Sequence, residues 1–242
     1  MPPPRPVDSR RLYQQVADRI RAVIADGGFG VGARLPPERE LALQLGVSRP
    51  SLREALIALE IDGRVEIRGG SGVYVCAPVA ASEARDTSAL GESPTELMQA
   101  RAALEGAVIT LAAARVTRAG LDRVEEALAA MRREHARGRM PLEADRRFHL
   151  AIAEMSANSV LVRMVGELFD GRHSPISSRL SGRSETAQTW TAALAEHEAI
   201  WRALEARDPQ AAAAAMFSHL RASQERWIGE PDASHSPPKD KP

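Results

Sequence analysis

Apolar residues near the start of the chain recur once per helical turn. They are Leu12, Val16, Ile20, Val23 and Ile24. Because one face of an α-helix collects residues three and four apart, this spacing predicts an amphipathic helix that stops before Gly27. Two shorter helical patterns follow, one over 38–45 that ends at Gly46 and one after Ser48, a residue type that favours the N-cap position.

The hydrophobic period then changes from helical to alternating. Residues 64–68 alternate polar and apolar side chains, 69–72 are Gly-Gly-Ser-Gly, and 73–75 resume the strand pattern. Glycines accept the positive φ angles of a tight turn, so these segments predict a β-hairpin. Three helices and a hairpin within 10–77 predict a winged helix-turn-helix domain.

The second half of the chain contains only helical patterns. They cover about 94–116, 119–137, 141–156, 159–170, 187–207 and 209–228. The segment 171–186, rich in Gly and Ser, stays open between a loop and a short helix. The predicted fold class is therefore mainly α, with an all-helical bundle over 94–229 behind the winged helix-turn-helix.

Polar segments separate and flank the two predicted domains. Residues 78–93 are small and polar without a period, which predicts a linker. Residues 1–9 and 230–242 are rich in proline and predict flexible tails.

Composition limits the classes of function. The 44% hydrophobic content supports two cores, and the zero formal net charge means that any affinity for nucleic acid must be local. Cys76 is the only cysteine, which excludes an internal disulfide or a thiolate cluster and fits a reducing cytoplasm. We find no signal peptide or membrane-spanning run, so we expect a cytoplasmic protein without a membrane partner.

The predicted second helix of the helix-turn-helix begins with two arginines. Arg49 and Arg53 lie one turn apart, and the small residues Ser48 and Ser51 beside them allow close approach to a DNA duplex. Arg39 in the preceding helix is a candidate for a phosphate contact. The alternative is a solvated face in which Arg53 pairs with Glu54 or Glu60, but the order of helix, Gly turn, arginine helix and hairpin favours DNA binding.

Three histidines and one aspartate form a candidate metal site. Asp145 and His149 are four residues apart and share a helix face, and His197 and His219 come from later helices. This ligand set suits zinc, with nickel or manganese as alternatives, and leaves positions open for a further oxygen. Spacing alone also allows ordinary hydrogen-bonded histidines.

The residues over 35–42, 46–56 and 68–75 resemble the GntR family of regulators. The resemblance implies that Arg39, Arg49 and Arg53 contact operator DNA and that the wing tip at Gly69–Gly70 reaches the minor groove.

The region from about 93 to 227 resembles the FCD-type effector domain of the FadR-like branch of that family. Metal-binding members carry an Asp, a His four residues on and two later His, which match Asp145, His149, His197 and His219. Ala157 stands where a glycine is usual.

Within that branch the chain is most similar to regulators of hexuronates and related sugar acids. The resemblance implies a small carboxylate effector, with Arg101 and Arg172 as its contacts. For Arg101 the alternative is a helix-surface ion pair with Glu105, and for Arg172 a solvated loop. Lactate or an amino acid is the alternative effector.

The resulting hypothesis is a homodimeric repressor that binds a pseudo-palindromic operator. A metal-dependent enzyme is the rival, but Glu198 beside His197 is the only candidate general base. An architectural DNA-binding protein fits poorly with the large neutral helical domain. We therefore expect no catalytic residues.

Overall fold

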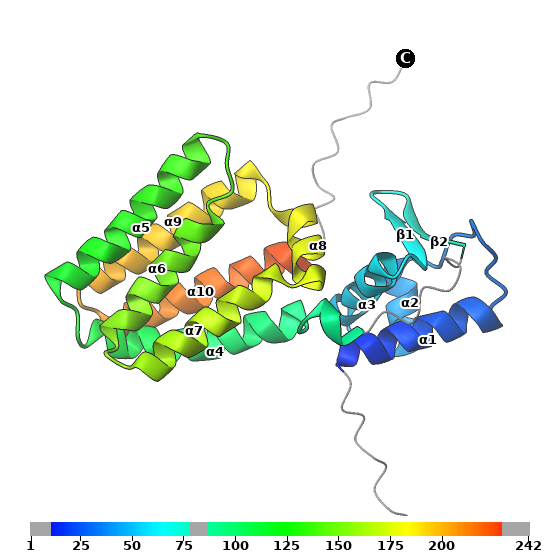
Figure 1. Cartoon of the computed structure of the whole chain (residues 1–242), viewed down its shortest axis with the longest axis horizontal. Helices are drawn as coiled ribbons and strands as arrows, with labels where there is room; N and C mark the ends of the chain where they lie inside the picture. The colour runs from blue at the N-terminus through cyan, green and yellow to red at the C-terminus, as the bar shows by residue number, and fades with distance from the viewer. Residues whose placement is uncertain (1–10, 78–86, 229–242) are drawn as a thin grey trace, which may run out of the picture. The chain divides into compact units, whose positions relative to one another are not determined.

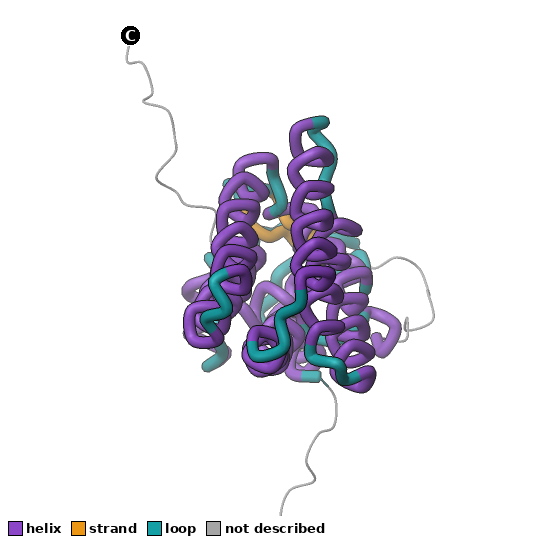
Figure 2. The backbone as a smooth tube through the Cα atoms, turned by 90° about the vertical axis from the view of Figure 1, so that its left-hand side faces the viewer, coloured by secondary structure: helices purple, strands orange, loops and turns teal. Residues whose placement is uncertain are grey.

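A computed structural model describes residues 11–77 and 87–228 of the 242-residue chain (Figure 1). These residues divide into two compact units. One contains the residues up to Thr95 together with His173–Leu180, and the other contains Glu96–Arg172 and the residues from Ser181 onward. The predicted fold class is confirmed, since the described chain is mainly helical and has one small hairpin (Figure 2).

The predicted tails at 1–9 and 230–242, and part of the predicted linker, lie outside the described residues. At the end of the predicted linker, Thr87–Leu90 forms a short 3-10 helix, η1.

The first unit has the predicted order of elements. They are α1 (Leu12–Asp26), α2 (Glu38–Leu45), α3 (Arg49–Ile61), β1 (Val65–Arg68) and β2 (Gly72–Val75). The two strands pair in antiparallel register, with Val65 opposite Val75. Apolar faces of all three helices and of the hairpin meet in one core that includes Ile20, Leu52 and Val73.

Gly46 and Ser48 form the turn between α2 and α3. Gly46 ends α2 in the left-handed conformation at φ 62°, which glycine adopts without a steric penalty. Ser48 caps α3, because its Oγ accepts a hydrogen bond from the backbone N–H of Ser51 at 3.2 Å. The turn therefore fixes the start of α3.

The second half of the described chain is helical. Its elements are α4 (Pro94–Ala113), α5 (Arg118–Ala136), α6 (Leu142–Met155), α7 (Ser159–Asp170), η2 (Gly171–His173), α8 (Pro175–Ser184), α9 (Ala187–Glu205) and α10 (Pro209–Ile228). Among them, α5 packs on α6 and α9, α6 on α7, and α9 on α10 (Figure 1). The open segment 171–186 contains a short helix, α8, which buries Ile176 and Leu180 at helical spacing.

Ala157, just after α6, has the left-handed φ of 54°. The side chain is exposed, and the next residue, Asn158, caps α7 by accepting hydrogen bonds from Val160 and Leu161 N–H groups. In this conformation the Cβ atom lies close to a backbone carbonyl oxygen, and this contact costs about 1–2 kcal/mol. Ala157 is therefore strained at a position where the family that the sequence resembles usually has a glycine.

We predict that Ala157→Gly raises the free energy of unfolding by about 0.5–1 kcal/mol, because relief of this strain exceeds the added entropy of the unfolded chain. Ala214, exposed within α10, gives the matched control: Ala214→Gly should lower stability by about 1 kcal/mol. Urea denaturation measures both. Equal destabilisation by the two substitutions would contradict the assignment of strain to Ala157.

Candidate functional site

Apart from Arg39 on α2, the predicted DNA-contact residues lie in the first turns of α3, at its N-cap, and at the tip of the hairpin. Arg49 is the first residue of α3, and Ser48 and Ser51 share a hydrogen bond between their hydroxyls at 2.8 Å. Gly69 and Gly70 are exposed, and a Cβ atom at either would meet nothing within 4 Å. The tip therefore presents bare backbone, and the DNA contacts of these residues stay a prediction.

Arg53 pairs with a different carboxylate from the two considered in the sequence. Its Nε donates to Glu38 Oε2 at 2.7 Å, which links α3 to α2. Glu54 is instead buried and accepts hydrogen bonds from Ser93 Oγ and from the backbone N–H of Thr95. Arg39 is exposed on α2. The Glu38 contact holds the Arg53 guanidinium at the junction of the two helices.

The four predicted metal ligands come together inside the second unit. Asp145 and His149 lie on α6, His197 on α9 and His219 on α10, and their candidate ligand atoms all lie within 4.8 Å of one another. All four side chains are buried. Residues far apart in the sequence thus form one polar cluster in the interior.

Each histidine of the cluster is oriented through its Nδ1 atom. His197 Nδ1 lies 2.7 Å from the backbone oxygen of Ala193, His219 Nδ1 lies 2.9 Å from Glu196 Oε2, and His149 Nδ1 contacts Glu105. A carbonyl or carboxylate oxygen only accepts, so Nδ1 carries the hydrogen in each pair. In a neutral imidazole this leaves Nε2 with a lone pair.

The inward atoms of the cluster lack hydrogen bonds. Asp145 Oδ1, His149 Nε2 and His197 Nε2 are buried, and none has a hydrogen-bond partner within 11–77 and 87–228. His197 Nε2 approaches Asp145 Oδ1 to 2.8 Å without hydrogen-bond geometry. Lone pairs that face one another in a buried site repel, and a cation between them would remove this repulsion. The residues present therefore fit a divalent cation.

The pKa values around the cluster favour a deprotonated Asp145 and a neutral His219, but a protonated His149. Burial alone would raise the pKa of Asp145, but the imidazoles of His149 and His197 lower it well below its usual value. Burial lowers the pKa of His219 to about 3, and His197 contributes to this. Burial would also lower the pKa of His149, but the carboxylates of Glu105 and Asp145 raise it. A cation would thus compete with protons mainly at His149.

Arg172 holds the outer oxygen of Asp145. Its Nη1 donates to Asp145 Oδ2 at 2.8 Å and its Nη2 to Glu185 Oε1 at 2.7 Å. The guanidinium lies over the rings of Phe169 and Trp227, at 5.1 and 4.5 Å from their centroids. Arg172 is buried in η2, so the solvated loop considered for it in the sequence is wrong.

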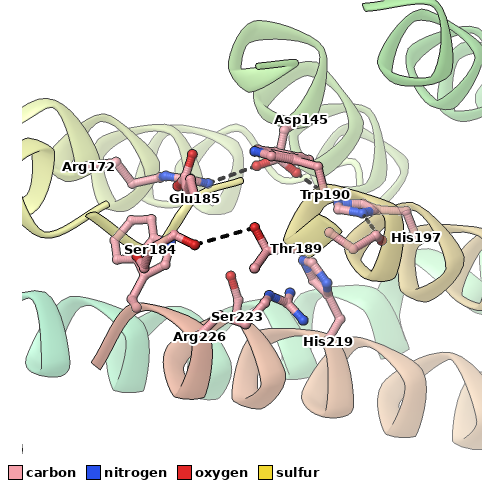
Figure 3. A pocket seen from close by; sticks show the side chains of 12 residues that line it. Asp145, Arg172, Ser184, Glu185, Thr189, Trp190, His197, His219, Ser223 and Arg226 are labelled. Atoms are coloured by element: carbon pink, nitrogen blue, oxygen red, sulfur yellow. Dashed lines mark hydrogen bonds and ion pairs between the residues drawn. The ribbon is translucent and has the colours of Figure 1, made fainter. Parts of the chain in front are cut away.

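A cavity opens onto the cluster (Figure 3). About 330 Å³ of free space lies between and in front of its walls, open solvent included. Its lining consists of Asp145, Arg172, Ser184, Glu185, Thr189, Trp190, Ala193, His197, His219, Ser223, Arg226 and Trp227. Hydroxyl, indole and guanidinium donors line this cavity together with the carboxylates of Asp145 and Glu185, and such groups can hydrogen-bond a small polar ligand.

Arg101 has features of both alternatives considered for it. It points into the protein and is only 2% exposed, yet its Nε donates to Glu105 Oε1 at 2.7 Å. Burial would raise the pKa of Glu105, but Arg101 and His149 lower it to about 2, so this carboxylate stays charged. Arg101 is not among the residues that line the cavity. Its contact with an effector stays a prediction.

The sequence did not reveal several residues of the cavity, among them Glu185, Trp190 and Arg226. Arg226 forms two hydrogen bonds to Glu196, at 2.6 and 2.9 Å, and so supports His219 from behind. Its position seven residues after His219 on α10 was a usable signal, since residues seven apart share a helix face. Glu198 pairs with Arg132 and Arg202 and is not part of the cavity lining.

Two family models match the chain. Residues 12–75 match the "Bacterial regulatory proteins, gntR family" model, and residues 96–222 match the "FCD domain" model. No helix in the described residues is long and apolar enough to cross a membrane.

Relatives match along most of the chain. The Uxu operon transcriptional regulator of Escherichia coli K12 is 36% identical and the match covers 91% of this chain and 88% of that protein. The Exu regulon transcriptional regulator of the same organism is also 36% identical, over 88% of this chain and 83% of that protein. The solved structure of a Streptococcus agalactiae GntR protein matches at 28% identity and a TM-score of 0.47, covering 88% of this chain and 99% of that one. The chain belongs to the GntR family. It has an FCD domain C-terminal to its helix-turn-helix in the sequence, and it is a DNA-binding transcriptional regulator and not an enzyme.

Proposed function

We propose that Asp145, His149, His197 and His219 hold a divalent cation, with zinc as the best fit and nickel or manganese as alternatives. The observation that carries the proposal is the set of buried inward atoms without hydrogen-bond partners in the described part of the chain. Three imidazoles and one carboxylate suit these metals, and a second layer of carboxylate or carbonyl oxygens on Nδ1 is typical of histidine ligands.

The charge of the cavity favours an anionic effector. The cluster, the cavity lining and the charged residues that contact them include four carboxylates and three guanidiniums. The carboxylates belong to Glu105, Asp145, Glu185 and Glu196, and the guanidiniums to Arg101, Arg172 and Arg226. They leave one negative charge, which a divalent cation converts into one positive charge. When bound, the cation supplies an open coordination position to a carboxylate oxygen, and the positive charge favours an acid over a neutral ligand.

We propose that the effector is a sugar acid, a hexuronate or an aldonate derived from one. The resemblance to hexuronate regulators supports this class. The cavity adds hydroxyls of Ser184, Thr189 and Ser223, and Trp190 Nε1 is buried without a hydrogen-bond partner among the described residues. A polyol satisfies such donors, whereas lactate is too short to offer more than one hydroxyl.

In this proposal the protein is a homodimeric repressor on a pseudo-palindromic operator. Arg39, Arg49 and Arg53 contact the DNA, and the wing tip reaches the minor groove. The acid weakens operator binding, and by reciprocity the operator weakens binding of the acid by the same factor.

We predict about one divalent ion per chain in protein supplied with metal, measured by metal analysis after dialysis. His149→Ala and His197→Ala should each lower occupancy, and a chelator should lower the thermal midpoint of the wild type, because an ion that binds only the folded state stabilises it. His135, which contacts Thr191 outside the cluster, provides the control substitution His135→Ala. If the wild-type protein holds no metal and the chelator does not change its thermal midpoint, the proposal is wrong and the four residues form only a buried polar cluster.

A second prediction concerns the arginines. Arg172→Ala should weaken binding of galacturonate to the metal-loaded protein by about thirtyfold, or about 2 kcal/mol, because a charged hydrogen bond is lost. Arg172→Lys should restore only part of the affinity, since an ammonium lacks the planar fork. Calorimetry with galacturonate, glucuronate, gluconate and galactonate measures this, with lactate and a fatty acyl thioester for comparison.

Arg146, which pairs with Asp170 outside the cavity lining, gives the control substitution Arg146→Ala. Arg101→Ala tests the sequence prediction: loss of galacturonate with metal retained supports a direct contact, and loss of metal instead assigns Arg101 to the support of His149. Full affinity in Arg172→Ala, or binding of the acyl thioester alone, would refute the proposed effector site.

A further inference from the structure

Arg172 is shared between two carboxylates that differ in their structural setting. Asp145 lies within α6 and is a candidate ligand of the cation. Glu185 lies in the turn between α8 and α9, just before the N-cap residue Thr186. One partner of Arg172 is therefore fixed by a helix and by the cluster, while the other is held in a turn.

Glu185 occupies the place where an effector carboxylate would be recognised. It lines the cavity, its side chain is 12% exposed, and its Oε1 accepts from Arg172 Nη2 at 2.7 Å. Figure 3 shows Glu185 and Arg172 side by side near Asp145. The flanking rings of Phe169 and Trp227 hold the guanidinium in place, so a ligand carboxylate must come to Arg172.

We propose that Glu185 is an internal competitor for the effector carboxylate, and this inference rests on the proposed function. Two carboxylates on one guanidinium nitrogen repel each other in a partly buried site. Binding of the acid therefore displaces Glu185 from Arg172 toward solvent. A neutral sugar has no charge to replace that of Glu185, so the exchange selects for acids over neutral sugars.

The opposite role for Glu185 would be that of a positioning residue. If it only orients Arg172, or accepts hydrogen bonds from ligand hydroxyls, its removal weakens binding of the acid. If it competes with the acid, its removal strengthens binding. The sign of the change in affinity separates the two roles.

The test measures binding of D-galacturonate to the full zinc-loaded chain by calorimetry. Glu185→Gln and Glu185→Ala should both bind about tenfold more tightly than the wild type, since no internal carboxylate has to be displaced. The alanine variant covers the case in which the glutamine amide still contacts Arg172. Metal content and thermal midpoint establish that each variant is folded.

Two controls isolate the effect of Glu185. Glu198→Gln on α9 removes the same charge outside the cavity lining, where Glu198 pairs with Arg132 and Arg202, and should leave the affinity unchanged. Binding of neutral D-galactose should not improve in either Glu185 variant.

Equal or weaker binding of galacturonate in both Glu185 variants would overturn the inference while the proposed function stands, provided that the wild type binds the acid. A wild type that holds zinc but binds none of the sugar acids would overturn the proposed function and this inference with it.

Discussion

Four ligand-type groups converge in the interior of the helical unit, and inward atoms of three of them meet no hydrogen-bond donor in the described part of the chain; this constraint organises the site. The inward atoms of Asp145, His149 and His197 are buried and lack hydrogen-bond partners among the described residues. Leaving one buried polar group unsatisfied costs about 1–3 kcal/mol, so three together are expensive unless something binds between them. In our proposal a cation resolves the conflict and links helices α6, α9 and α10 through one point.

The surroundings of the cluster repeat one arrangement, in which a carboxylate and an arginine lie behind a ligand. Glu105 and Arg101 stand behind His149, and Glu196 and Arg226 stand behind His219. Burial would raise the pKa of Glu196, but His219 and Arg226 lower it to about 2, so this carboxylate remains an acceptor. These pairs fix the imidazoles in the tautomer that turns Nε2 inward, which preorganises the site.

Asp145 differs from these two histidines, because its arginine binds it directly with no carboxylate in between. Arg172 binds Asp145 on one nitrogen and Glu185 on the other. The same side chain thus belongs both to the support of the cluster and to the surface that meets a ligand. Binding of an acid and the state of the cation site are coupled through it in our proposal.

The sequence predicted most of the fold because hydrophobic periodicity and caps are local signals. Helix α8 is harder to predict, because its glycine and serines obscure the helical spacing of the buried pair Ile176 and Leu180. The four cluster residues were predictable from their types and the family resemblance. The Arg101–Glu105 pair was predictable because its members are four residues apart on one helix, but the partners of Arg53 and Arg172 were not, since Glu38 and Asp145 lie on other elements. Such pairs depend on tertiary packing, which spacing does not encode.

The central claim is that the three imidazoles and the aspartate bind the cation directly. X-ray absorption at the zinc edge of the zinc-loaded full chain tests this claim without reference to any effector. We expect imidazole scattering from three nitrogens, with oxygen completing the shell, at about 2.0–2.2 Å. A shell without imidazole scattering, or one containing sulfur, would contradict the account.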